Sequence, residues 1–188
     1  DEHTICFVSF LVKILFRSSD KWLLHPRLSP AQFFDRLDAH LVWLRQNREI
    51  RVIQLVRRDG IDWLKSKYLA RATGTFTHTH YPEDAKITVP VHRALKALQA
   101  KNWVDHRLAS LADSNPYHRV IYEDFAADNR RELEACLAFL GCDIKRLPPD
   151  GRFTEKQSKQ SAASYIRNFE ELASAIEAGQ LQSSALLS

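Results

Sequence analysis

The sequence is poor in glycine, cysteine and methionine, and these shortages narrow the classes of protein it can be. Five glycines are spread singly over 188 residues, and methionine is absent. The three cysteines, Cys6, Cys136 and Cys142, form no pair with metal-ligand spacing and suit a reduced compartment better than a disulfide framework. Cys136 lies on an apolar helical face, where a structural role is expected. We therefore expect a cytoplasmic protein.

Long apolar stretches are also missing. An apolar run near the N-terminus, residues 5–16, is interrupted by Lys13 and is too short to cross a bilayer as a helix. It follows two acidic residues and shows no small-residue cleavage site, so it does not resemble a signal peptide. We expect a core strand there, and no transmembrane segment.

The length and composition suffice for one substantial hydrophobic core. Hydrophobic residues make up 45% of the chain, so a single domain over residues 1–188 is the simplest prediction. The net charge of +4 allows an anionic ligand without identifying it. A group of arginines could instead indicate nucleic-acid binding, which we favour least because they flank an apolar strand pattern. They are Arg45, Arg48, Arg51, Arg57 and Arg58.

The most informative stretch is a predicted strand, turn and helix. The apolar run 52–56 predicts a buried strand of a parallel sheet, and Asp59-Gly60 predicts a turn. Beyond the turn, apolar residues recur at helical spacing, namely Ile61, Leu64, Tyr68 and Leu69. Open α/β sheets bind ligands beyond the carboxyl ends of their strands, and Arg57 and Arg58 stand at that position.

Two side chains of this stretch suit a phosphate. Arg58 presents a planar fork of donors, and Ser66 offers a hydroxyl eight residues later, within the predicted helix. Arg-Arg-Asp followed by this serine resembles the 3′-phosphate-binding strand, loop and helix of sulfotransferases that use 3′-phosphoadenosine 5′-phosphosulfate (PAPS). The resemblance implies that Arg58 and Ser66 hold the 3′-phosphate, with Arg57 either assisting or pairing with a nearby carboxylate. A solvated basic strand end is the alternative interpretation.

Two later motifs resemble the same family and occur in the same order. A short apolar run at residues 120–121 leads into Tyr-Glu-Asp-Phe at 122–125, and the next helical pattern ends in Phe-Leu-Gly. Gly141, the last of these residues, also fits a left-handed helix end. Glu123 and Asp124 could form a catalytic carboxylate pair, but adjacent side chains diverge, and the resemblance implies an architectural role.

The C-terminal part carries one more family-like feature. Lys156-Gln-Ser is followed by a predicted helix whose sequence, Asn-Phe-Glu-Glu-Leu at 168–172, resembles the terminal helix of the family. In the family the segment before this helix approaches the nucleotide. The resemblance therefore implies that Lys156 and Lys159 contact the cofactor, whereas the composition alone is typical of an exposed linker.

Candidates for the reacting end of the donor are fewer. Phe-Leu-Val-Lys at 10–13 is similar to a strand of the family, which implies that Lys13 faces the sulfate; an edge lysine that reaches solvent is the alternative. The polar stretch 72–84 is expected to line the acceptor pocket, where His78 or His80 could act as general base. A His-x-His pair without a third ligand is weak evidence for a metal.

One feature of the family is missing. Its members wrap the 5′-phosphosulfate with the backbone N–H groups of a loop rich in Arg, Thr, Gly and Ser after the first strand. No such loop occurs in these 188 residues. Because the sequence also begins without methionine, we expect a fragment or a diverged member whose 5′ half-site is missing.

These observations predict an α/β protein with three layers, in which a central, mainly parallel sheet is flanked by helices as in the P-loop NTPase-like fold of sulfotransferases. Helical periodicity after Ser29-Pro30 and after Val89-Pro90 predicts two of the flanking helices. The resemblance implies metal-independent transfer of a sulfuryl group from PAPS to a hydroxyl, and it is greatest to the bacterial subgroup that sulfates sugars and glycolipids. The alternatives are an inactive nucleotide-binding module of the same fold and a basic nucleic-acid-binding domain.

Overall fold

The computed structural model describes residues 30–74, 81–143 and 160–185. The chain divides into two compact units. The first unit is Asp1–Val56 with Val104–Pro149, and the second unit is Arg57–Trp103 with Asp150–Ser188. The helix α4 (Val91–Ala109) contributes residues to both units. A single domain over the whole chain stays a prediction.

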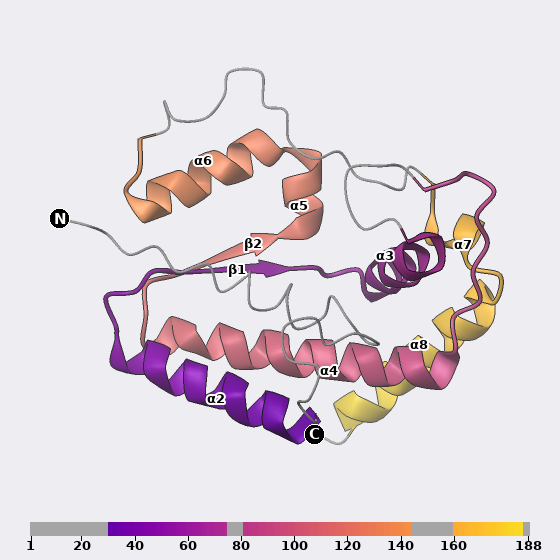
Figure 1. Ribbon diagram of the computed structural model, residues 1–188, viewed down its shortest axis with the longest axis horizontal. Coiled ribbons are helices and arrows are strands. Elements are labelled where there is room, and N and C mark those ends of the chain that lie inside the picture. Colours follow the sequence, from indigo (N-terminus) through magenta and orange to yellow (C-terminus); the bar gives the residue numbers. More distant parts are fainter. Residues whose placement is uncertain (1–29, 75–80, 144–159, 186–188) are drawn as a thin grey trace. The chain divides into compact units, whose positions relative to one another are not determined.

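The first unit contains a parallel pair of strands, which lie side by side in Figure 1. β1 (Val52–Val56) pairs with β2 (Tyr117–Ile121) in register from Val52 opposite Tyr117 to Val56 opposite Ile121. The strand at 52–56 and its parallel pairing were predicted from the sequence, and they are confirmed; β2 extends the short apolar run 120–121 toward the N-terminus as far as Tyr117. Helices combined with a parallel strand pair make the described residues an α/β arrangement. The three-layer architecture with a larger central sheet stays a prediction.

Strand β1 is buried mainly on one face. Val52, Gln54 and Val56 are buried, whereas Leu55 is 41% exposed. The apolar run predicted burial on both faces, but the side chains of a strand alternate in direction, and only one set points into this core. Gln54 satisfies its polar atoms by donating to the carbonyl oxygen of Asp105 and accepting from the Tyr117 hydroxyl.

Apolar residues of α2 (Pro30–Gln46) form much of the core of the first unit. Proline stands at its first position, as predicted, because the missing N–H of proline is not needed in the first turn. Buried leucines at 37, 41 and 44 follow the helical period and form one apolar face. They pack in one cluster with residues from β1, the end of α4 and the short 3-10 helix η1 (Ser110–Asp113), namely Ile50, Val52, Val104, Leu108 and Leu111.

Two short helices follow β2 in the first unit. α5 (Tyr122–Ala127) starts directly at the end of the strand, and α6 (Asn129–Leu140) follows it with the Asp128 side chain as its N-cap. Gly141 ends α6 with a φ of 72°, and the next N–H, that of Cys142, donates to the carbonyl oxygen of Leu137. The predicted left-handed helix end at Gly141 is therefore confirmed.

The second unit begins with the turn into α3 (Gly60–Thr73). The Asp59 carboxylate caps the helix by accepting from the N–H of Asp62 at 2.8 Å, and Gly74 ends it with a φ of 69°. Gly60 allows a close helix contact, because a Cβ atom at this position would lie 2.9 Å from Cδ2 of Leu98 on α4. The turn and helix predicted at Asp59-Gly60 are confirmed.

The rest of the second unit packs the C-terminal helices against α3 and α4. α7 (Ala162–Tyr165) lies beside α3 and next to α8 (Phe169–Ala185) (Figure 1). A parallel bridge joins Ile87 to Ile166, and the Asn168 side chain bonds both the N–H and the carbonyl oxygen of Val89. The core contains residues from all four helices, including Leu64, Leu69, Ala94, Leu98, Tyr165 and Leu172. Within the described ranges, no helix has the length and hydropathy needed to cross a membrane.

Candidate anion-binding site

The candidate site lies on the first two turns of α3, within the second unit. Arg57 directly follows β1, and its guanidinium turns toward the helix. Its Nη1 lies 3.3 Å from the Ser66 hydroxyl, and its Nη2 makes an ion pair with the Asp62 carboxylate. The other oxygen of Asp62 pairs with the Lys65 ammonium. Three side chains of α3, those of Asp62, Lys65 and Ser66, thus form a continuous polar cluster with Arg57.

The cluster leaves a surplus of positive charge. Arg57 and Lys65 each contribute one positive charge and Asp62 contributes one negative charge, so the three together carry one net positive charge at neutral pH. Arg58 stands next in the chain and adds another. The side chains of Arg57 and Asp62 are only 14% and 12% exposed, so their interactions are weakly screened by solvent. An anion with several oxygen atoms is the ligand that this arrangement suits.

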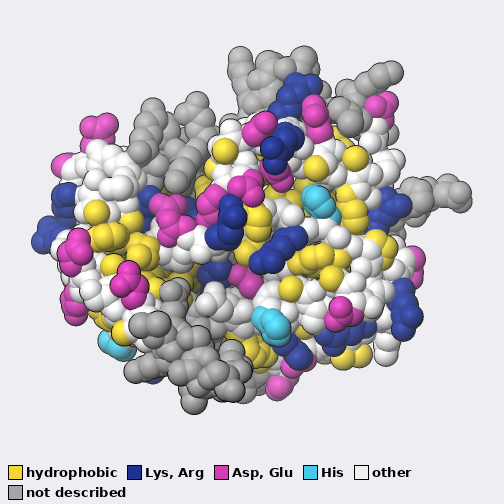
Figure 2. Space-filling view, turned by 180° about the vertical axis from the view of Figure 1, so that it is seen from behind, with side chains coloured by type: hydrophobic (Ala, Val, Ile, Leu, Met, Phe, Trp, Pro, Cys, Tyr) yellow, Lys and Arg dark blue, Asp and Glu magenta, His cyan; other side chains and the backbone are white. Residues whose placement is uncertain are grey.

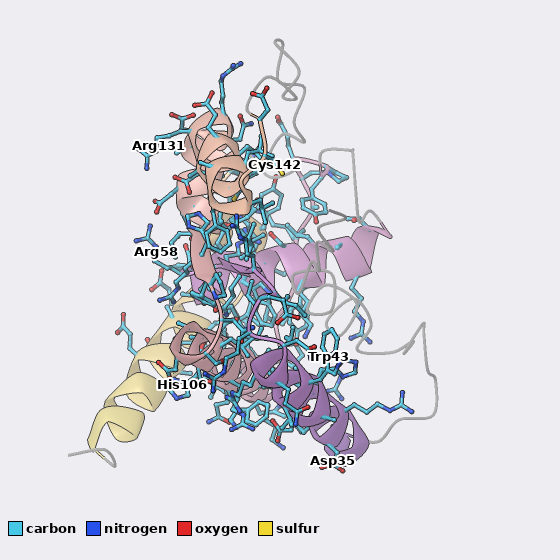
Figure 3. All side chains as sticks on the ribbon, turned by 90° about the vertical axis from the view of Figure 1, so that its left-hand side faces the viewer. Asp35, Trp43, Arg58, His106, Arg131 and Cys142 are labelled. Atoms are coloured by element: carbon cyan, nitrogen blue, oxygen red, sulfur yellow. The ribbon has the colours of Figure 1, made fainter. Side chains whose placement is uncertain are left out.

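The structure places Arg57 beside the predicted serine. Nη1 of Arg57 lies within hydrogen-bond distance of the Ser66 hydroxyl. Arg58 is exposed and extends away from the ribbon in Figure 3. Both arginines follow the last residue of β1, Val56, so their directions are set by the irregular segment that leads into α3 and not by the pleat of the strand. Of the two roles predicted for Arg57, pairing with a carboxylate is confirmed. A phosphate contact of Arg58 stays a prediction.

Lys65 is buried to an unusual degree for a lysine. Its side chain is 1% exposed, and its ammonium pairs with Asp62 and donates to the carbonyl oxygen of Gln160 at 3.3 Å. The ammonium also lies 6.0 Å from the centre of the Tyr165 ring, at the outer limit of a cation–π contact. Lys65 therefore connects the polar cluster on α3 to the chain just before α7.

Two further residues support the same helix. The Tyr81 hydroxyl donates to the carbonyl oxygen of Ser66 at 3.3 Å, which fixes the backbone that carries the serine. The ammonium of Lys67 lies 5.1 Å from the centre of the Trp63 ring. Burial lowers the pKa of Lys67, because the charged form loses hydration.

The remaining predicted site residues lie outside the described residues. These are Lys13, His78, His80, Lys156 and Lys159. Their roles toward the sulfate, the acceptor and the nucleotide stay predictions. Glu123 and Asp124 are described, and both are half-buried in the first turn of α5. Among the described residues, no group of three or more His, Cys, Asp or Glu side chains is arranged to hold a metal.

The arginines that suggested nucleic-acid binding have different environments. In the first unit, Arg45 donates to the Ser110 hydroxyl and Arg51 donates to the carbonyl oxygen of Phe139. In the second unit, Arg57 is held by Asp62. On the face shown in Figure 2, Lys and Arg side chains are interspersed with Asp and Glu side chains. A basic stripe with interleaved aromatics, which that function requires, is not visible on this face.

Sequence reasoning missed Asp62 and Lys65. Both were assigned to the helix, but no role was given to either. Their spacing of three residues is a signal that could have found them, because side chains three apart on a helix face one another. A lysine on the apolar side of a helix, close to Leu64 and Leu69, is a second signal, because such a charge requires a partner.

Comparisons with protein-family models, with curated proteins and with solved structures found no match.

Proposed function

We propose that the protein binds the 3′-phosphate of PAPS at Arg57, Arg58 and Ser66 and transfers the sulfuryl group to a hydroxyl of a carbohydrate or glycolipid. The observation that carries the proposal is the contact of Arg57 with Ser66 at the carboxyl end of a parallel strand. A guanidinium and a hydroxyl at one point provide several donors for phosphate oxygens. The family-like order of the motifs from Arg57 to Leu172 supports the same function.

The local geometry favours a phosphate over the side of α3 rather than at its N-terminus. The N-terminus of α3 is already capped by the Asp59 carboxylate, which would repel a second anion. Ser66 lies between one and two turns further along the helix, where Arg57 supplies positive charge. The arginine and the serine can therefore hold a phosphate together, and we propose that Arg58, the exposed residue that follows Arg57, supplies further donors.

The proposed reaction is an in-line transfer. The bond between sulfur and the bridging oxygen of the 5′-phosphosulfate breaks, and its electron pair stays on the 5′-phosphate. A new bond forms between sulfur and the acceptor oxygen, whose proton passes to a base, and 3′-phosphoadenosine 5′-phosphate is released. The protein contributes positioning and charge neutralisation, as in phosphoryl transfer. Lys13 is proposed to face the sulfate, and His78 or His80 to accept the proton.

A second candidate is a nucleotide-binding module without transferase activity. It is favoured by the glycines, which are spread singly and offer no loop for the 5′-phosphosulfate. Both functions use the same 3′-phosphate site. They differ in whether the purified chain moves labelled sulfate from PAPS to a sugar or glycolipid acceptor. Transfer above a protein-free blank excludes the inactive module.

The binding experiment is a calorimetric titration with 3′-phosphoadenosine 5′-phosphate and, in parallel, with 5′-AMP. Hydrogen bonds to charged groups contribute about 1.5 to 3 kcal/mol, so the bisphosphate should bind roughly ten- to a hundredfold more tightly. Arg57→Ala and Arg58→Ala should each reduce this preference and leave the affinity for 5′-AMP nearly unchanged. Arg48→Ala is the matched control, because Arg48 is also an exposed arginine next to β1 in the sequence.

The outcomes separate the alternatives. Equal affinity for the two nucleotides, or a preference that survives both arginine substitutions, contradicts the 3′-phosphate site. A preference that Arg48→Ala reduces as much as Arg58→Ala indicates a general effect of positive charge. Such a result should also show a steep dependence on salt and would favour the nucleic-acid interpretation.

A further inference from the structure

We propose that Asp62 and Lys65 are positioning residues for the anion-binding arginine: Asp62 sets the orientation of the Arg57 guanidinium, and Lys65 cancels the negative charge of Asp62. This inference rests on the proposed function, since it assigns to these residues a task in 3′-phosphate recognition. Neither residue belongs to the motif that suggested the site, and neither is proposed to touch the ligand.

The first step of the argument is the division of the guanidinium between two partners. Nη2 of Arg57 pairs with Asp62, and Nη1 points to the Ser66 hydroxyl. An arginine side chain loses up to about 2 kcal/mol of rotamer entropy when it is immobilised. Because Asp62 already holds one end of the guanidinium, this entropy is lost when the protein folds and not when a ligand binds. The free protein thus has a pre-oriented donor next to Ser66.

The second step is the charge balance. A carboxylate beside a phosphate site would weaken anion binding if its charge were not compensated. Asp62 has one oxygen on Arg57 and the other on Lys65, so Lys65 supplies the compensating charge. The positive charge of Arg57 then remains available to the ligand. The ammonium is almost completely buried, which strengthens this compensation because water does not screen it.

The third step concerns what holds Lys65. Its ammonium donates to the carbonyl oxygen of Gln160 and lies near the Tyr165 ring. Both contacts come from the C-terminal part of the second unit. The lysine is therefore kept at Asp62 by the packing of α7 on α3, and the compensation of the Asp62 charge depends on residues about a hundred positions away in the sequence.

The test uses the full chain with Asp62→Asn/Lys65→Met as the principal variant. The double substitution removes one negative and one positive charge, so the net charge is unchanged. Replacing a buried ion pair by neutral side chains is often close to neutral for stability, whereas Asp62→Asn alone would leave the buried lysine unpaired. Asp38→Asn is the matched control, because it breaks an aspartate–arginine pair, that of Asp38 with Arg107, in the other unit.

Two measurements are made on each variant. The first is the ratio of the affinities for 3′-phosphoadenosine 5′-phosphate and 5′-AMP. By analogy with outer-shell partners of metal ligands, the double variant should lose about tenfold in this ratio. The second is the NMR signal of the Arg57 guanidinium, assigned with Arg57→Lys. Its two Nη groups should give separate signals in the wild type and one averaged signal in the double variant. Asp38→Asn should change neither.

Lys65→Met alone separates the two roles. Arg57 keeps its partner Asp62, so the separate guanidinium signals should persist. The ratio of affinities should still fall, by less than in the double variant, because the carboxylate charge is no longer cancelled. A purely structural role of Lys65 would lower the melting temperature and leave the ratio unchanged.

The results also distinguish this inference from the proposed function. If the wild type shows no preference for the bisphosphate but has separate guanidinium signals that the double variant averages, the sulfotransferase proposal fails and the positioning of Arg57 stands. Averaged signals in the wild type overturn the positioning inference. So does a folded double variant that keeps both the separate signals and the wild-type ratio.

Discussion

Asn115 holds together the segment that joins α2 to β1, and its replacement by alanine should be among the most destabilising single changes in the first unit. The side chain is 5% exposed. Its amide nitrogen lies 3.0 Å from the carbonyl oxygens of Leu44 and Asn47 and 3.3 Å from that of Ile50. These three carbonyls come from the end of the helix and from the turn that follows it. One side-chain amide thus lies within hydrogen-bond distance of three carbonyl oxygens around that turn.

The size of the destabilisation follows from the number of hydrogens on the Asn115 amide nitrogen. An amide nitrogen has two hydrogens, so the three carbonyls share at most two full hydrogen bonds. Each contributes about 1 kcal/mol net. The carbonyls of Leu44 and Asn47 keep a backbone donor, the N–H groups of Asn47 and Ile50, so a further penalty of similar size falls mainly on the Ile50 carbonyl. We therefore expect Asn115→Ala to lower the free energy of unfolding by about 2 to 3 kcal/mol.

Urea unfolding followed by circular dichroism measures this effect. With a slope of about 2 kcal/mol per molar urea, the midpoint should fall by roughly 1 to 1.5 M. The control is Asn47→Ala, which removes an exposed hydrogen bond to the carbonyl oxygen of Trp43. The control should lose no more than about 1 kcal/mol. An equal shift in both variants, or a change at Asn115 below about 0.5 kcal/mol, would refute the assignment of the turn to this amide.

Two further predictions concern other parts of the molecule. Gly60→Ala should destabilise the protein by about 1 kcal/mol in thermal unfolding, because the new methyl group meets the Leu98 side chain. The loss of stability should disappear in a Leu98→Val background. A loss that persists there contradicts the packing argument. Burial, and secondarily the charge of Glu132, raise the pKa of the Cys136 thiol. In a variant without the other two cysteines, the rate of alkylation plotted against pH should therefore have its inflection above the ordinary thiol pKa. Glu132→Gln should lower that inflection only in part, and an inflection below the ordinary value would contradict the burial. Since the native state holds this proton more tightly, the stabilising contribution is complete below the pKa of the unfolded thiol and is lost as the pH rises through the raised value.

Local sequence signals predicted the elements well where a single residue type determines the backbone. Pro30 begins α2, Asp59-Gly60 forms the turn before α3, and Gly141 ends α6. Proline tolerates the first turn of a helix, aspartate caps the N–H groups, and glycine adopts a positive φ without strain. These constraints act over a few neighbouring residues, so the sequence alone reveals them.

The site was predicted less completely, because it depends on directions and on distant contacts. The sequence placed two arginines after β1, but the contact of Arg57 with Ser66 depends on the path of the irregular segment between Val56 and Gly60, which no local pattern predicts. The burial of Lys65 depends on Gln160 and Tyr165, which no local pattern connects to α3. The division into two units was also not predicted, because each unit combines segments far apart in the sequence.

This interleaving of segments has a consequence for synthesis on the ribosome. The core of the first unit joins Leu37 to Leu111, and that of the second unit joins Leu64 to Leu172. Neither core can close when its first helix leaves the exit tunnel, because its partners have not yet been translated. Contacts of such long sequence separation slow folding and leave apolar helix faces exposed to solvent in the meantime. We expect the first core to close once Leu111 has emerged, while the helix that carries Ser66 waits for almost the whole described chain.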